Sequence, residues 1–400
     1  MPKLVTKNKC MGCGACYNAC RSDAIKMEAD YTGFLYPVVD ENKCIDCKLC
    51  EKACPQLSTI KDSVINPKAY IAQNKDDEIR RQSTSGGAFT AIANEVIKQG
   101  GVVFGAAFEE DYTVRHISVE NEKELEKFRN SKYVQSDIGE TYKSAKEYLL
   151  KGRKVCFSGT PCQIHGLKKY LGKDFDNLIT VDVMCRAVPS PKVFKKYLDD
   201  RYRKYPNMEK VVFRDKARGY SYSTLSIYDK NKNLYRGGSE YDQWLRIFFK
   251  GFCNRESCFD CNFQTGNRIS DFTLWDCWGT QNYSPKMDDN KGTTNVIVWT
   301  SKGLELFNSI NSLRIKEIGI ENIDASLERG AMPRPVLDKE EFWNDVEKME
   351  ADAFLTKYVP LSMKVRVKSL VRQTIWRLHL HNFVRKTVHF IRRIKKKIGR

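Results

Sequence analysis

The chain has 400 residues, of which 41% are hydrophobic and 11% aromatic, so it can bury a core and form two or three structural units. It begins with MPKLVTKNKC, which is no apolar leader, and no window reaches the roughly 18 apolar residues of a membrane span, so we expect a cytoplasmic protein. Fifteen cysteines in such a chain predict metal or redox chemistry instead of disulfides. The net charge is +18, but residues 361–400 hold thirteen Lys and Arg and no acidic residue, which leaves +5 elsewhere and makes nucleic acid an unlikely partner.

Two groups of cysteines open the sequence with one shared spacing. The pattern C-x2-C-x2-C-x3-C occurs twice, and Pro55 follows the second copy where Arg21 follows the first. This spacing is typical of [4Fe-4S] ligands, because two-residue gaps bring three thiolates of one loop to three corners of a cubane. The eight residues are Cys10, Cys13, Cys16, Cys20, Cys44, Cys47, Cys50 and Cys54.

We expect the two groups to exchange their fourth ligands. The fourth cysteine of each group should lie at the start of the following helix and point toward the other loop. Zinc is the alternative metal, but zinc sites pair C-x2-C units and have no use for a third close cysteine. Residues 1–58 resemble a bacterial-type two-cluster ferredoxin, which implies an electron-donor protein such as ferredoxin, or a redox partner subunit. The expected ligand sets are Cys10, Cys13, Cys16 and Cys54 for one cluster, and Cys44, Cys47, Cys50 and Cys20 for the other.

From residue 65 onward, short apolar strands alternate with helical segments, which favours an α/β fold. Two turns before expected helices are rich in hydroxyls and glycines: 83–87, STSGG, and 158–162, SGTPC. Free N–H groups in such turns bind anions such as a cofactor phosphate, although similar turns cap helices in every α/β protein. The expected strands are AYIAQ, GVVFGAAF, KVCFSG, LITVDVM, DFTLWD and NVIVWT.

Another cysteine group follows in FCNRESCFDCNF. This segment holds Cys253, Cys258 and Cys261, and Cys185 lies alone after the strand LITVDVM. Four such cysteines suit a third [4Fe-4S] cluster or, equally well on spacing alone, a zinc ion. Cys162, at the start of a helix, is a candidate for a thiol with a lowered pKa and a catalytic role.

The C-terminal segment predicts a basic amphipathic helix. Its apolar residues recur at three- and four-residue steps, as one stripe of a helix requires. With Trp376 and Phe383 beside Lys and Arg, it suits the anionic inner face of a membrane. The alternatives are docking on an acidic surface of the protein itself or of a partner, and RNA binding. The stripe comprises Val371, Ile375, Leu378, Val384, Val388 and Ile391.

Several motifs, taken in order, resemble the coenzyme F420 hydrogenase/dehydrogenase beta-subunit family. They are STSGGAFTAIA, RNSKYVQSD, VCFSGTPCQIHGLKKYL, VMCRAVPSPKVFKKYL, SCFDCNF and NRISDFTLWDCWG, and the resemblance covers about residues 65–310. It implies FAD beside a [4Fe-4S] cluster, with electrons leaving or arriving as hydride on a small organic carrier such as coenzyme F420. It also implies a third cluster on Cys185, Cys253, Cys258 and Cys261.

The same resemblance implies a set of flavin contacts. Lys132 and Tyr133 of RNSKYVQSD are further candidates, Lys132 as a cation that stabilises reduced, anionic flavin. Their alternative roles are a solvated lysine and a core tyrosine. The implied contacts of the two turns are Ser85, Gly86, Gly87, Gly159, Thr160 and Pro161.

The sequence departs from the family pattern in two of these motifs. Arg186 and Ala187 stand where relatives tend to have His-Gly, and Cys277 stands inside Asp-Cys-Trp-Gly where they have Asp-Phe-Trp-Gly. A positive charge at Arg186, beside an implied cluster ligand, should favour the reduced cluster. No residue identifies the organic acceptor.

We therefore expect a ferredoxin-like α+β unit over 1–58, a larger α/β flavin and iron–sulfur unit over 65–345, and a basic helical tail over 346–400. The larger unit should divide into parts at about 65–145 and 146–345. The predicted function is an iron–sulfur flavin-dependent oxidoreductase. The alternatives are an electron-transfer subunit that serves a partner enzyme and has no substrate site, and a membrane-surface assembly in which the clusters are only structural.

Overall fold

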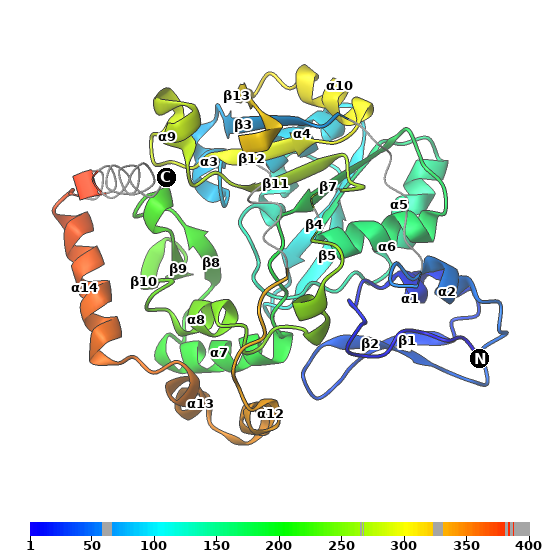
Figure 1. Ribbon diagram of the computed structural model, residues 1–400, viewed down its shortest axis with the longest axis horizontal. Coiled ribbons are helices and arrows are strands. Elements are labelled where there is room, and N and C mark those ends of the chain that lie inside the picture. The colour runs from blue at the N-terminus through cyan, green and yellow to red at the C-terminus, as the bar shows by residue number, and fades with distance from the viewer. Residues whose placement is uncertain are drawn as a thin grey trace.

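An eight-stranded mixed sheet forms the centre of the computed structural model, which describes residues 1–57, 66–264, 266, 268–322, 331–380, 383, 384 and 387 (Figure 1). All six expected strands lie in this sheet, so the mixed α/β fold is confirmed. Neighbours from β11 to β4 are parallel, and antiparallel pairs flank them on both sides. In spatial order the strands are β13 (Leu313–Ile318), β3 (Lys68–Asn74), β12 (Thr294–Val298), β11 (Phe272–Asp276), β7 (Leu178–Val183), β6 (Val155–Gly159), β4 (Val102–Phe108) and β5 (Val114–Val119).

Helices cover both faces of this sheet, which explains the almost continuous apolar runs of its central strands. On one face, Ile92 and Val96 of α4 and Phe307 of α10 pack in a core with strand residues such as Val181. On the other face, α5 and α6 pack on the sheet around Phe157. Strands before and after residue 145, where we expected the larger unit to divide, thus lie in one sheet. The helices are α3 (Asp77–Gln82), α4 (Ala88–Lys98), α5 (Thr141–Leu150), α6 (Pro161–Leu171), α9 (Thr280–Tyr283) and α10 (Ser301–Ser309).

A second core lies beside the large sheet and was not expected from the sequence. Its antiparallel sheet has the order β10-β9-β8, and four helices join it around Trp244 and Phe342. Phe354 and Leu355 are fully buried there, so the packed body continues beyond the boundary expected at residue 345. The elements are β8 (Lys210–Asp215), β9 (Thr224–Asp229), β10 (Lys232–Gly238), α7 (Pro191–Lys204), α8 (Gln243–Phe249), α12 (Lys339–Lys348) and α13 (Ala351–Tyr358).

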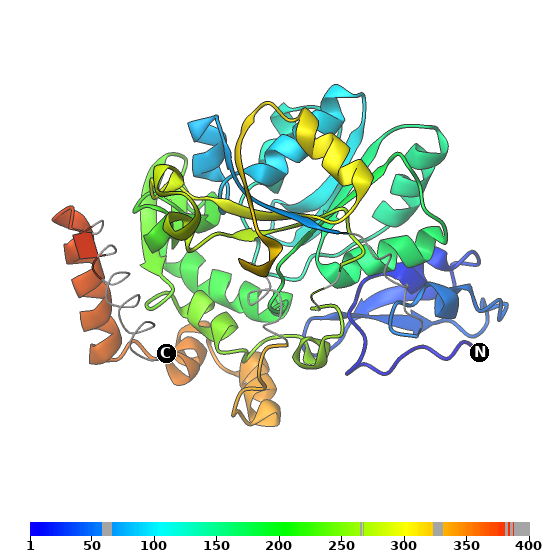
Figure 2. The ribbon, with the colours of Figure 1, turned by 45° about the horizontal axis from the view of Figure 1, so that its top comes forward.

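The N-terminal unit rests on helix α6 (Figures 1 and 2). Its antiparallel pair β1–β2 is accompanied by two short helices, and both helices pack against α6. Ala15 and Ala53 join the same core as Ile164 and Leu167 of α6, and their small side chains let the helices approach closely. The elements are α1 (Ala15–Ala19), β1 (Ile25–Ala29), β2 (Leu35–Val39) and α2 (Leu49–Ala53).

Helix α14 (Met363–Arg377) lies at the edge of the molecule in both views (Figures 1 and 2). It contains the first part of the basic segment 361–400. Val388 and Ile391 of the predicted stripe lie outside the described residues. In the described part of the chain, no helix is both long and apolar enough to cross a membrane.

Candidate functional site

Each N-terminal cysteine group folds as a loop followed by one helical turn. Gly14 and Lys48 take the left-handed conformation, with φ of 71° and 60°, and start α1 and α2 within the motifs. Cys20 and Cys54 therefore follow the ends of these helices, whereas we expected them at the start of a following helix. The reason is that a helix begins before the third cysteine of each group and uses the three-residue gap as its last turn.

The fourth cysteine of each N-terminal group lies near the loop of the other group, as the predicted exchange of ligands requires. A small cavity is lined by Cys10, Cys13, Cys16 and Cys54 together. Burial, followed by the neighbouring thiolates of Cys10 and Cys54, raises the pKa of Cys16 to about 12. In the second group, burial raises the pKa of Cys50, and Cys20 of the first group adds to this effect. The chain thus brings the fourth cysteine of each group to the other loop.

A third group of cysteines comes together, but its members differ from the expected set. Cys185 follows β7, Cys258 and Cys261 lie in and after a 3-10 helix (Glu256–Asp260), and Cys162 occupies the first turn of α6. Burial raises the pKa of Cys185, and the charges of Cys258, Cys162 and Cys261 raise it further, in that order. Burial and then Cys162 and Cys261 likewise raise the pKa of Cys258 to about 12.

Cys253 does not join this group, contrary to expectation. Its side chain is fully buried in the second core among apolar residues such as Trp244, and burial alone raises its pKa to about 12. The backbone explains this, because the Cys253 carbonyl accepts a hydrogen bond from the N–H of Ser190. This bond ties the Cys253 backbone to Ser190, the N-cap residue of α7, a helix of the second core.

Cys162 is the fourth member of this third cysteine group. Its pKa is raised, whereas we expected it to be lowered. Burial and then the Cys261 thiolate raise the pKa of Cys162 to about 11, against the hydrogen bond from Thr160. The signal for this placement was present in the sequence. Because β6 and β7 are parallel neighbours, the residues after them, Cys162 and Cys185, must meet at one edge of the sheet.

Helix α6 joins the third cysteine group to the N-terminal unit. Gly166 lies one turn after Cys162, and a Cβ placed on it would lie 3.1 Å from the Cys13 Sγ and 3.1 Å from the Tyr142 hydroxyl. Glycine therefore lets the Cys13 loop pack closely on the helix, and any side chain here would require its neighbours to shift. The charges of Cys13 and Cys162 are also close enough to interact.

We expect Gly166→Leu to displace the Cys13 loop and to lower the iron content of the N-terminal unit. Gly166→Ala should have a smaller effect, since its Cβ contacts require shifts of only a few tenths of an ångström. Iron analysis and electron paramagnetic resonance of the reduced proteins measure both effects. Equal iron and unchanged spectra in Gly166→Leu would contradict this packing.

Arg255 fastens the first cluster loop to the segment that carries Cys258. The arginine is fully buried, and its Nε donates to the Cys10 carbonyl at 2.7 Å. Its Nη2 donates to the Leu35 carbonyl at 3.0 Å, and its guanidinium lies 4.2 Å from the ring centroid of Tyr36. Ser257 adds a second bond to the Cys10 carbonyl, at 2.9 Å. Hydrogen bonds from Arg255 and Ser257 thus hold the first N-terminal cysteine group against the segment of the third cysteine group.

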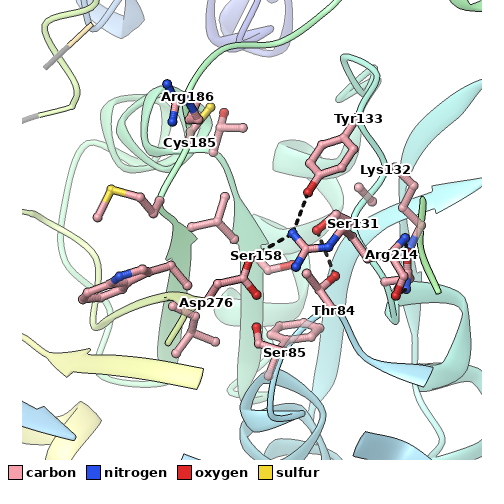
Figure 3. Close-up of a pocket in the computed structure, with 18 of the residues that line it drawn as sticks. Thr84, Ser85, Ser131, Lys132, Tyr133, Ser158, Cys185, Arg186, Arg214 and Asp276 are labelled. Atoms are coloured by element: carbon pink, nitrogen blue, oxygen red, sulfur yellow. Dashed lines mark hydrogen bonds and ion pairs between the residues drawn. The ribbon is translucent and has the colours of Figure 1, made fainter. Parts of the chain in front are cut away.

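A cavity of about 810 Å³ opens at the carboxyl ends of the parallel strands, where α/β proteins bind ligands (Figure 3). Cys162 and Cys185 form part of its wall, next to the exposed Arg186. Gly86 and Pro161, both expected as flavin contacts, do not line it. Six of the expected contacts do: Ser85, Gly87, Lys132, Tyr133, Gly159 and Thr160.

The two turns that are rich in glycine and hydroxyl residues, 83–87 and 158–162, have different roles. At the first, Gly86 N–H donates to Thr294 Oγ1 at 2.8 Å, and Gly87 begins α4 with a φ of 79° and no side-chain cap. At the second, the Thr160 N–H donates to Gln163 Oε1 at 2.9 Å, as part of a capping box. The capping alternative thus describes the second turn, whereas the first leaves the start of α4 open toward the cavity.

Lys132 is not the free cation that we expected near a flavin ring. Its Nζ donates to the backbone carbonyls of Lys127 and Arg129, at 2.7 and 3.1 Å, and burial lowers its pKa to about 7. Tyr133 lines the cavity, and its hydroxyl accepts a hydrogen bond from Arg214 at 3.2 Å.

Arg214 is the buried cation of this cavity and was missed in the sequence (Figure 3). Its Nη1 bonds Asp276 at 2.9 Å, and Tyr220 donates to the same carboxylate at 3.0 Å. Although burial disfavours the charge, Asp276 and then Tyr133 raise the pKa of Arg214. Its Nη2 is buried and finds no hydrogen-bond partner in the described part of the chain. Trp278 stacks on Tyr220 with ring centroids 4.6 Å apart.

These cysteine groups define an iron–sulfur electron-transfer protein. Residues 9–57 match the 4Fe-4S dicluster domain, residues 69–142 the N-terminal part of the coenzyme F420 hydrogenase/dehydrogenase beta subunit, and residues 152–323 its C-terminal part. The chain belongs to the coenzyme F420 hydrogenase/dehydrogenase beta-subunit family and carries a [4Fe-4S] dicluster domain at its N-terminus. This family supplies subunits of oxidoreductases.

Among solved structures, a chain of the xenon-derivatised F420-reducing [NiFe] hydrogenase complex from Methanosarcina barkeri is similar. The two share 15% identity with a TM-score of 0.46, over 76% of this chain and 97% of that chain. A comparison with curated proteins finds no match.

Zinc at the third group stays an alternative. Among the residues that the structure describes, no three His, Cys, Asp or Glu side chains are arranged to hold a single metal ion. The same holds for the eight cysteines within the dicluster match, so this observation does not separate zinc from a cluster.

Proposed function

We propose that the protein is an iron–sulfur flavoprotein that passes electrons between its N-terminal clusters and a flavin in the large cavity. The observation that supports this proposal most directly is that α6 connects a cysteine of the N-terminal unit with cysteines at the cavity. Cys13 packs on Gly166, Cys162 lies one turn earlier, and Cys185 lines the cavity. Redox centres on these residues would form a chain from the surface unit to the cavity.

Twelve cysteines serve three clusters in this proposal. The N-terminal sets are those expected from the sequence, with Cys54 and Cys20 exchanged. The third cluster takes Cys162 in place of Cys253, because Cys162 lies with the other three cysteines and Cys253 lies in the second core. The proposed sets are Cys10, Cys13, Cys16 and Cys54; Cys44, Cys47, Cys50 and Cys20; and Cys162, Cys185, Cys258 and Cys261.

The cavity residues suit a flavin nucleotide such as FAD. The open start of α4 at Gly87 offers backbone N–H groups to a phosphate, and the free Nη2 of Arg214 offers a charged donor to an anionic group. When bound, a flavin supplies the junction between one-electron and hydride transfer. Asp276 and Tyr133 hold the guanidinium of Arg214 in place, and Tyr220 donates a hydrogen bond to Asp276.

Substitution of Arg214 is expected to weaken flavin retention. Arg214→Leu removes one charge-assisted donor of about 1.5–3 kcal/mol, which corresponds to roughly ten- to hundredfold in affinity. Flavin released per chain and the flavin dissociation constant measure this effect, with circular dichroism as a check on folding. Lys132→Met is the matched control, since its ammonium is engaged by carbonyls. A larger loss of flavin in Lys132→Met than in Arg214→Leu would contradict this assignment.

The alternative function is an electron-transfer subunit with no substrate site of its own. One experiment separates the two: the anaerobic protein is reduced chemically, freed of reductant, and mixed with organic hydride acceptors such as a deazaflavin or a nicotinamide nucleotide. Formation of the reduced acceptor supports the oxidoreductase. Reoxidation by an electron-transfer protein, with no reduction of any organic acceptor, favours the subunit.

A further inference from the structure

Helix α14 docks on the body through its polar side. Ser369 is only 3% exposed, and Arg372 forms an ion pair with the buried Glu240 at 2.6 Å and lies 4.2 Å from the ring centroid of Tyr222. Trp376 is half-buried and lies 5.6 Å from the guanidinium of Arg218. The helix thus contacts the body through Arg372, Trp376 and the buried Ser369, whereas a surface helix usually packs through an apolar stripe.

The apolar side of α14 consequently faces solvent. Its members lie at Met363 and four, seven, eight and fifteen residues after it, so they share one side of the helix and form one stripe along it. We call this stripe the outer face. Its exposed fractions are 74% for Met363, 52% for Val367, 61% for Leu370, 51% for Val371 and 61% for Leu378.

Basic side chains flank the outer face. Lys364, Arg366, Lys368 and Arg377 are all exposed on α14. The sequence from 361 to 400 carries thirteen Lys and Arg and no Asp or Glu. An apolar stripe between rows of cations is the pattern of helices that lie in the interface of an anionic bilayer, where the apolar side enters the acyl boundary and the cations meet the headgroups.

We propose that α14 binds the surface of an anionic membrane through its outer face and holds the electron-transfer body there. The charge pattern selects this occupant over a second copy of the chain, because two such helices would bring like charges together. A partner protein, or residues 381–400 of the same chain, are the other occupants that the experiment distinguishes. This proposal stands independently of the flavin.

The test is flotation of the full-length, cluster-containing protein with phosphatidylcholine vesicles, with and without phosphatidylglycerol. We expect flotation with the anionic vesicles only, weakened by salt. The triple variant Val367→Gln, Leu370→Gln, Val371→Gln should lose flotation by at least about tenfold, since three apolar side chains no longer enter the bilayer. All three are exposed, so the fold should persist.

A matched control replaces three exposed apolar residues far from α14: Leu150→Gln, Ile315→Gln and Val336→Gln, with exposed fractions of 63%, 46% and 103%. This control should float like the wild type. No flotation of the wild type with anionic vesicles would overturn the proposal and leave an intramolecular or protein occupant. Equal flotation of both triple variants and the wild type would also overturn it, because the outer face would then be irrelevant.

Discussion

Cys162→Ala is expected to reduce the iron content from about twelve to about eight atoms per chain, the loss of one cubane. The physical reason is that Cys162 lies with Cys185, Cys258 and Cys261, and a cubane that lacks one thiolate is not retained in a cavity open to solvent. The measurement is iron and acid-labile sulfide on anaerobically purified protein. The spectrum of the reduced protein should lose one of its cluster signals.

Cys253→Ala is the matched control for this result. Cys253 is fully buried in the second core, so its loss should leave a small cavity, cost about 1 kcal/mol of unfolding free energy, and leave iron unchanged. The opposite pattern, with iron lost in Cys253→Ala and kept in Cys162→Ala, would restore the ligand set that the sequence suggested.

Arg255→Leu should both destabilise the protein and uncouple the N-terminal unit from the third cysteine group. Three partly buried acceptors lose a charged donor: the carbonyls of Cys10 and Leu35 and the side-chain oxygen of Gln135. The Cys10 carbonyl keeps its bond from Ser257. The loss of these charge-assisted hydrogen bonds should cost roughly 3–5 kcal/mol in unfolding free energy. Denaturant unfolding under anaerobic conditions measures this cost.

A second readout for Arg255→Leu reports the contact itself. Magnetic coupling between the first cluster and the proposed third cluster, measured by electron paramagnetic resonance of the fully reduced protein, should weaken when the loop of Cys10 is released. Arg203→Leu is the control, because Arg203 is 53% exposed and should change stability by no more than about 0.5 kcal/mol. Unchanged coupling and unchanged stability in Arg255→Leu would mean that the unit is held by other contacts.

Local patterns were sufficient to predict much of the fold. The apolar runs KVCFSG and LITVDVM became the buried neighbours β6 and β7, and the turn before AFTAIANEVIKQ became the start of α4. The eight N-terminal cysteines lie in the two expected groups because their spacing is set by one tight loop each. The second core was missed because β8, β9 and β10 contain no more than three consecutive apolar residues and depend on packing with distant helices.

The candidate site was predictable only where its residues are close in sequence. Cys258 and Cys261 are three residues apart, but Cys253, five residues before Cys258, lies in the second core, where its carbonyl accepts the backbone N–H of Ser190. Arg214 comes from the second sheet and meets Asp276 at the end of β11, a pairing that no local pattern indicates. Gly166 stands in an ordinary helical sequence, and its role appears only when the Cys13 loop packs on it.

The most direct test of the proposed electron path is the cofactor content of one anaerobic sample of the full chain. Iron, acid-labile sulfide and released flavin should be about twelve, about twelve and about one per chain, which three cubanes and one flavin require. About eight irons and no flavin would contradict the account, since the dicluster domain would then stand alone and the cavity would have no part in electron transfer.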